Sequence, residues 1–285
     1  MNFGGIDPTY ASLDRAAFVV VPVPYDLTTT YQGGARKGPS AILEASCNME
    51  LYDEELQTEP FRAGIHTLPP LEAVAAGPEG MLERVEEEIS GILDEEKIPV
   101  LLGGEHSVTL GAVRALKKRN PRLSVLHLDA HADMRDSYQG TPYSHACIGR
   151  RMKEICPVVQ VGIRSMSAEE AAFLRKGSVS VFTAAQLRKD RSWIAKVLRC
   201  LSKQVYVSVD LDAFDPSIMP ATGTPEPGGM LWHEVLDLMR EVCKRRQVVG
   251  FDIVELAPIP GMVAPDFLAA KLAYRMMGYL SKTAL

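Results

Sequence analysis

The chain has 285 residues, of which 46% are hydrophobic and 24% charged, a composition typical of a soluble globular enzyme. The formal net charge of -5 argues against nucleic acid as a partner, and no apolar run approaches the roughly 20 residues of a membrane span. Residues 1–15 lack the basic start and apolar stretch of a signal peptide, and the five cysteines are scattered without CxxC spacing. We therefore expect free thiols, a cytoplasmic location and no membrane partner.

Strand-like and helix-like segments alternate from one end of the chain to the other. Apolar runs predict buried strands at residues 17–21, 98–102, 123–128, 158–161, 179–182, 205–209 and 248–254. Helices are predicted from Pro39, where proline occupies the first turn, and over residues 80–96, 107–118 and 264–280. Because the strands are apolar on both faces and are separated by helices, they favour an α/β fold with a mainly parallel, doubly covered sheet. We find no internal repeat or low-complexity linker, so residues 1–285 are interpreted as a single domain.

Potential metal ligands follow three of these predicted strands. They are His106 after a Gly-Gly turn, Asp129, His131 and Asp133 in the next block, and Asp210 and Asp212 in the third. The carboxyl ends of parallel strands are where ligands bind, and alternate residues of an extended chain lie on the same side. Four neighbouring carboxylates repel one another, and two divalent ions would neutralise them. Many oxygen ligands with two imidazoles favour manganese, whereas structural zinc would more often recruit cysteine.

Other titratable residues near these blocks allow competing interpretations. His127 lies inside an apolar strand and is interpreted as a packed core residue, while His66 and His233 are interpreted as loop and surface residues. Cys147 is close in sequence to a histidine, but no third group that would orient a thiol nucleophile is visible. The Asp-Pro pair at Asp215 is predicted to fix a turn rather than bind metal.

Six ordered motifs resemble the arginase/agmatinase (ureohydrolase) family. They are GARKGPSAI at 34–42, GGEHS at 103–107, DAHAD at 129–133, SVDLDAFDP at 208–216, PATGTP at 220–225 and DIVEL at 252–256. Within this family, residues 143–151 resemble agmatinases more than arginases. The resemblance implies an arginase-like fold, a three-layer α/β/α sandwich around a mainly parallel sheet. Family members are commonly trimers or hexamers, so we expect a homo-oligomer.

The resemblance also implies a ligand set for two Mn²⁺ ions. One ion would be bound by His106, Asp129, Asp133 and Asp210, and the other by His131, Asp129, Asp210 and Asp212. Asp129 and Asp210 would then bridge the two ions. Glu105 stands where many family members carry aspartate, but that position is not a ligand in the family. Asp252 is interpreted as a residue that does not bind metal itself but orients one of the metal-binding side chains.

The chemistry implied is hydrolysis of a guanidino group to an amine and urea. A guanidinium is a poor electrophile, but two divalent ions can lower the pKa of a shared water so that a bridging hydroxide attacks its carbon. His145 is the candidate proton shuttle to the leaving amine, because imidazole titrates near neutral pH. The resemblance assigns Glu255 to orienting the guanidinium through charge-assisted hydrogen bonds, and places Thr224 beside the metals and the substrate.

Agmatine, hydrolysed to putrescine and urea in polyamine synthesis, is the first choice of substrate. Around residues 135–143 the chain lacks the arginase-type segment that contacts the α-amino and α-carboxylate groups of arginine. Guanidinobutyrate, aminopropylagmatine and arginine remain alternatives. Outside this activity we consider a binuclear phosphoesterase, for which Arg135 and Arg150 are the nearby cations, a single-zinc deacetylase of related fold and a non-catalytic metal-binding homologue.

Overall fold

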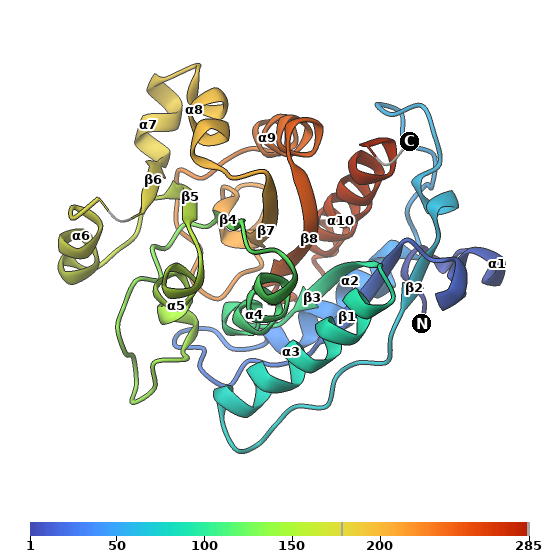
Figure 1. Ribbon diagram of the computed structural model, residues 1–285, viewed down its shortest axis with the longest axis horizontal. Coiled ribbons are helices and arrows are strands. Elements are labelled where there is room, and N and C mark those ends of the chain that lie inside the picture. Colours follow the sequence, from blue (N-terminus) through green and yellow to red (C-terminus); the bar gives the residue numbers. More distant parts are fainter. Residues whose placement is uncertain (178, 284–285) are drawn as a thin grey trace.

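The computed structural model describes residues 1–177 and 179–283, and its strands form one parallel sheet (Figure 1). The strands are β1 (Phe18–Val23), β2 (Ile65–Thr67), β3 (Ile98–Gly103), β4 (Leu123–Leu128), β5 (Val158–Ile163), β6 (Ser180–Thr183), β7 (Gln204–Asp210) and β8 (Gln247–Val254). Their order across the sheet is β2-β1-β3-β8-β7-β4-β5-β6, and every neighbouring pair is parallel. The predicted α/β class and parallel sheet are therefore confirmed.

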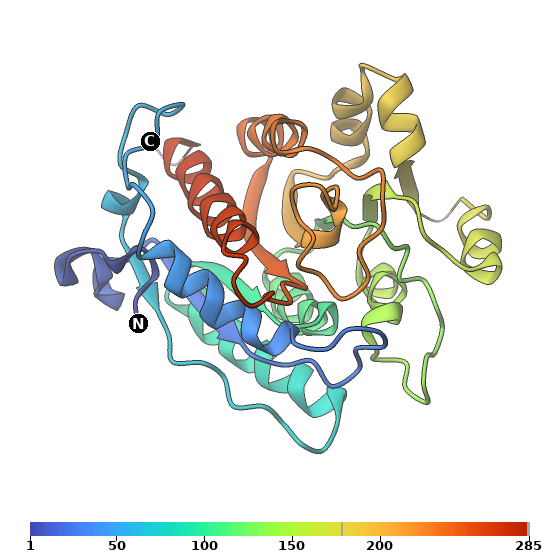
Figure 2. The same cartoon turned by 180° about the vertical axis from the view of Figure 1, so that it is seen from behind.

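Helices cover both faces of this sheet and make a three-layer sandwich. They are α1 (Pro8–Ala11), α2 (Gly38–Ser46), α3 (Pro78–Asp94), α4 (Thr109–Arg119), α5 (Ile148–Ile155), α6 (Ala168–Leu174), α7 (Ala184–Lys189), α8 (Trp193–Cys200), α9 (Trp232–Arg245) and α10 (Ala264–Thr283). On one face α3, α4 and α5 share a buried apolar cluster with the strands (Figure 1). On the other face the strands pack against α2, α8, α9 and α10, of which α2 and α10 lie in front in Figure 2. No described helix combines the length and apolar character needed to cross a bilayer.

The four central strands bring distant parts of the sequence to one edge of the sheet. Strands β3, β8, β7 and β4 are adjacent, and in a parallel sheet their carboxyl ends all lie on the same side. The segments that follow them begin at Gly104, Glu255, Leu211 and Asp129. The three predicted ligand blocks and Glu255 therefore meet above the middle of the sheet.

Strand β2 is the one strand of the described chain that the apolar pattern did not predict. It is a three-residue edge strand with only its first residue buried, so it carries no apolar run. The expectation that His66 lies in a loop is therefore wrong, because His66 is in β2, where its Nδ1 lies 2.8 Å from the carbonyl oxygen of Ala11. His233 lies on the surface, on α9, as predicted.

Candidate metal centre

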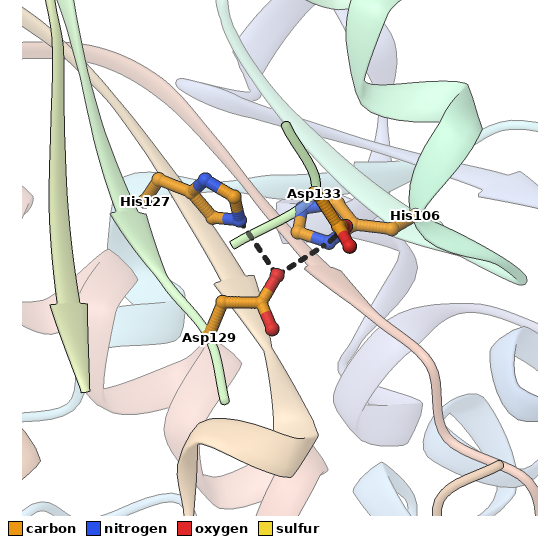
Figure 3. Close-up of side chains that lie close together, drawn as sticks. All are labelled: His106, His127, Asp129 and Asp133. Carbon is orange, nitrogen blue, oxygen red and sulfur yellow. Dashed lines mark hydrogen bonds and ion pairs between the residues drawn. The ribbon is translucent and has the colours of Figure 1, made fainter. Parts of the chain in front are cut away.

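Four of the predicted ligands meet around a single imidazole nitrogen. His106 Nδ1 lies 3.2 Å from Asp129 Oδ2, 3.2 Å from Asp210 Oδ2 and 3.6 Å from Asp133 Oδ2. All four residues are buried at the carboxyl ends of β3, β4 and β7. Figure 3 shows His106, Asp129 and Asp133 turned toward one another. The donor atoms of His106, Asp129 and Asp133 lie close enough together to share one ion.

The remaining two predicted ligands lie on the other side of Asp129. His131 Nδ1 is 2.8 Å from Asp212 Oδ2 and 3.6 Å from Asp129 Oδ1, and these three residues form a second possible metal-binding group. One oxygen of Asp129 thus faces His106 and the other faces His131. Backbone amides hold the carboxylates of Asp210 and Asp212 in place. Asp210 Oδ1 accepts from Asp212 N at 2.8 Å, and Asp212 Oδ1 accepts from Ala130 N at 2.9 Å.

The protonation of His106 shows that the cluster fits a cation. Its Nε2 lies 2.9 Å from Ser208 Oγ, and the Ser208 hydroxyl donates to Asp252 Oδ1 at 2.7 Å. Because the single hydroxyl proton of Ser208 is used for Asp252, His106 must donate from Nε2, so that in the neutral ring the lone pair is on Nδ1. That buried Nδ1 has no hydrogen-bond partner among the described residues, although three carboxylates face it. A lone pair among carboxylate oxygens is a site that a divalent metal satisfies.

The sheet register explains how the supporting residues reach His106. His127, Ser208 and Asp252 are partners in adjacent strands β4, β7 and β8, so their side chains lie on the same face of the sheet. Asp252 also accepts from the hydroxyls of Tyr206 at 2.7 Å and Thr109 at 2.9 Å. The buried Asp252 carboxylate thus accepts from three hydroxyl groups, and Ser208 connects it by hydrogen bonds to the predicted ligand His106.

The electrostatics of the cluster also favour added positive charge. Burial, together with repulsion from Asp129, raises the pKa of Asp133, and burial with repulsion from Asp212 raises the pKa of Asp210. Burial acts against charge on Asp129 too, but the neighbouring imidazoles of His106, His127 and His131 hold its pKa well below the usual range. Despite its burial, the pKa of His106 is raised well above its ordinary value by Asp129 and Asp210. These carboxylates attract a positive charge to Nδ1, whether a proton or a metal ion.

Two residues of the centre have backbone conformations that side chains rarely adopt. Asp133 has a φ of 52° and Glu255 a φ of 68°, both in the left-handed region. The Glu255 backbone is held by a hydrogen bond from its N to Gly104 O at 2.7 Å, and its Oε1 accepts from His106 N at 2.6 Å. Strain of this kind persists where the surrounding structure over-determines it, and it clusters at functional sites.

A cavity of about 300 Å³ opens beside the cluster and includes the other predicted site residues. His145, Thr224 and Glu255 all line it together with His131 and three of the four predicted aspartate ligands. Burial, reinforced by repulsion from Glu105, raises the pKa of Glu255 to about 8. Burial lowers the pKa of His145 to about 4, and the neighbouring imidazoles of His106 and His131 add to this shift. The nine predicted site residues therefore lie in this pocket or, as His106 and Asp129 do, among the buried ligands beside it.

His127 has a closer relation to the centre than its sequence context indicated. It is buried in β4 as predicted, but its Nε2 lies 2.7 Å from Asp129 Oδ2 (Figure 3). Its Nδ1 lies 3.2 Å from Gln160 Nε2, which also donates to Ala132 O at 2.7 Å. His127 therefore accepts at Nδ1 and donates from Nε2 to the metal-facing carboxylate. The available signal was its spacing, because residues i and i+2 of a strand lie on the same side.

The other candidate groups take structural positions. Cys147 is buried, and burial followed by repulsion from Asp133 raises the pKa of its thiol to about 11, which disfavours a thiolate nucleophile. Asp215 fixes its turn as predicted, since Oδ2 accepts from the backbone N atoms of Gly228 and Gly229 at 2.8 and 3.0 Å. Arg150 stacks on Phe173, with its guanidinium carbon 4.0 Å from the ring centre.

Comparison with known proteins agrees with this site. A family model described as the Arginase family matches residues 16–278. An N(1)-aminopropylagmatine ureohydrolase from a Synechocystis species is 42% identical over 272 residues, which cover 93% of this chain and 89% of that protein. An enzyme of the same name from Thermus thermophilus is also 42% identical, with coverage of 97% and 93%. Among solved structures, agmatine ureohydrolase of Thermoplasma volcanium has a TM-score of 0.90 at 34% identity, covering 100% of this chain and 96% of that one.

The chain therefore belongs to the arginase family and is a ureohydrolase with the arginase-like fold. This membership favours guanidino hydrolysis over the phosphoesterase and deacetylase alternatives.

Proposed function

We propose that this ureohydrolase acts on N1-aminopropylagmatine and releases spermidine and urea. The observation that carries the proposal is the 42% identity, over more than nine-tenths of the chain, to two relatives that bear this activity in their names. Agmatine is the second candidate, because the similar structure from Thermoplasma volcanium is named an agmatine ureohydrolase. Both substrates share the guanidino end and differ in the cationic tail.

The pocket beyond the metal centre supports a cationic tail. Glu170 lines it and is buried, and although its oxygens accept from Met134 N and Ser167 N, it adds negative charge away from the predicted metal ligands. Arg135 also lines the pocket, but its Nε lies 4.0 Å from Glu170 Oε2 and its guanidinium carbon lies 4.8 Å from the centre of the Tyr138 ring. A tail carboxylate would need a cation free of such contacts, which favours ammonium-bearing tails over guanidinobutyrate.

We assign the two manganese ions to the residues that the family resemblance implies. His106, Asp129, Asp133 and Asp210 would hold one, and His131, Asp129, Asp210 and Asp212 the other. When bound, such ions supply an acidified, positioned water and offset the repulsion among the four carboxylates. The unpartnered Nδ1 of His106 and the raised pKa values of Asp133 and Asp210 support this assignment.

Glu255 would orient the substrate, and His145 would transfer the proton. Glu255 uses Oε1 for the His106 amide, so Oε2 can accept from the planar donor edge of a guanidinium. Binding a cation there favours the ionised carboxylate, whose pKa burial otherwise raises to about 8. His145, kept neutral by its low pKa, accepts a proton from the attacking water and delivers it to the leaving amine. Thr224 lines the same pocket beside the reacting group.

The proposal extends to the assembly and location of the enzyme. The family resemblance supports a homo-oligomer, a trimer or hexamer, of one catalytic domain per chain. The five cysteines are free, which supports a reducing cytoplasm.

Substrate preference tests the proposal directly. The manganese-loaded enzyme is assayed for urea with N1-aminopropylagmatine, agmatine, guanidinobutyrate and arginine in parallel, and kcat/KM is compared. We expect the highest value for N1-aminopropylagmatine. A higher value for agmatine would transfer the assignment to the second candidate. Tight guanidine binding without urea from any substrate would favour a non-catalytic homologue.

A further inference from the structure

Three hydrogen-bonding groups from distant parts of the chain form a line that ends on His145. Glu105 lies in the turn after β3. Its Oε1 accepts a hydrogen bond from Thr28 Oγ1 at 2.8 Å, and its Oε2 accepts one from Thr28 N at 2.6 Å. Thr28 Oγ1 in turn lies 3.0 Å from His145 N and 3.1 Å from His145 Nδ1. Glu105 and Thr28 are both buried. Glu105 thus holds Thr28 through two hydrogen bonds, and Thr28 contacts His145 at two of its nitrogen atoms.

The direction of these bonds follows from the number of protons available. A threonine hydroxyl has one proton and two lone pairs. Its shorter bond is to the Glu105 carboxylate, and a carboxylate is the stronger acceptor. The backbone N–H of His145 occupies one lone pair of Thr28 Oγ1. The contact with the ring then requires His145 Nδ1 to donate to the other lone pair.

This arrangement determines which ring nitrogen can exchange protons in the pocket. With the proton on Nδ1, the neutral ring has its free lone pair on Nε2. No hydrogen bond among the described residues involves His145 Nε2, while the side chain lines the cavity. The second neighbour of Nδ1, Ser144 Oγ, is farther away at 3.4 Å and also accepts from Ala146 N.

We propose that Thr28, anchored by Glu105, is a positioning residue that fixes the ring of His145 in its Nδ1–H tautomer, with Nε2 available to the substrate. The consequence for turnover rests on the proposed function, in which His145 moves a proton. The tautomer itself does not depend on which guanidine is hydrolysed. Thr28 acts only through His145, so its loss should lower kcat and leave KM and metal content almost unchanged.

The test compares Thr28→Val, which removes the hydroxyl at similar volume, with Thr28→Ser, which restores it. Thr67→Val is the matched control, because Thr67 Oγ1 also accepts from a backbone N–H, that of Phe3 at 2.9 Å, but belongs to the edge strand β2 and does not line the pocket. Bound manganese, kcat and KM are measured for each full-length enzyme. In parallel, long-range proton–nitrogen NMR of ¹⁵N-histidine-labelled protein reports the tautomer of His145, whose signals are identified by their loss in His145→Asn.

We expect the Nδ1–H tautomer in the wild type and in Thr28→Ser. Thr28→Val should lose this tautomer and roughly 10- to 100-fold in kcat, a part of what a positioned acid–base group contributes, while Thr67→Val behaves as wild type. An Nε2–H tautomer in the wild-type protein would overturn the inference even if Thr28→Val fails to fold. Wild-type kcat in Thr28→Val would also overturn it. If no guanidine is hydrolysed by the wild type, the proposed function fails, and the NMR result still decides the tautomer.

Discussion

Replacing Ser208 with alanine should weaken metal binding without removing any predicted ligand. Ser208 Oγ accepts from His106 Nε2 at 2.9 Å and donates to Asp252 at 2.7 Å. Without it, His106 loses the group that keeps its proton on Nε2, so the proton can move to Nδ1 and occupy the lone pair that would bind the metal. Loss of such a supporting partner typically costs 10- to 100-fold in metal affinity. This corresponds to about 1.4–2.8 kcal/mol of binding free energy.

Calorimetric titration of manganese into metal-stripped protein measures this effect. Ser124→Ala is the matched control, because Ser124 is buried near the opposite end of β4 and accepts from Ser202 N at 3.1 Å and Ser202 Oγ at 2.9 Å. We expect Ser124→Ala to bind manganese as the wild type does and Ser208→Ala to bind it more weakly. Equal manganese affinity in all three proteins would refute the argument that Ser208 sets the tautomer of His106.

Three further changes probe the metals, the shuttle and the turn at Asp215. Metal removal by chelation should lower stability by about 2.7 kcal/mol for each ion lost, relative to protein in manganese at 100 times its Kd, which is roughly 5–10 °C in Tm per ion by scanning calorimetry. An unchanged Tm would contradict metal binding to the folded state. His145→Asn should keep its bound manganese, measured by elemental analysis, but lose roughly 10²- to 10⁴-fold in kcat; full activity would exclude it as the shuttle. Asp215→Asn should lower the free energy of unfolding in urea by about 1 kcal/mol at neutral pH. Hydrogen bonds from Ser217, Gly228 and Gly229 lower the folded pKa of Asp215 to about 2, so its contribution exists above the unfolded pKa near 4 and is lost as pH falls toward 2; a destabilisation by Asp215→Asn that persists equally in acid would contradict this.

Local patterns predicted the sheet well because its interior strands are buried on both faces. The runs at residues 123–128 and 205–209 became β4 and most of β7, and the ligand blocks follow at their carboxyl ends. The spacing of Asp129, His131 and Asp133 was enough to place them near one another, although not to show that Asp133 adopts a φ of 52°. Short-range spacing in the sequence was therefore enough to predict most residues of the metal centre.

The contacts that depend on strand order could not be obtained from the sequence. His127, Ser208 and Asp252 become neighbours only because β4, β7 and β8 are adjacent in that order. Thr28 meets Glu105 across 77 residues and His145 across 117. Nothing in residues 26–30 indicates such partners, because a threonine beside a turn usually bonds its own backbone. The short edge strand β2 was missed for a different reason, as it has no buried run.

The most direct test of the central claim is urea release from N1-aminopropylagmatine as manganese is added stepwise to metal-stripped enzyme. We predict no turnover without metal, and full activity once both proposed positions are filled, with urea and spermidine formed in equal amounts. Activity that is complete in the stripped enzyme, or metal binding that leaves both N1-aminopropylagmatine and agmatine intact, would contradict a two-manganese ureohydrolase of this substrate class.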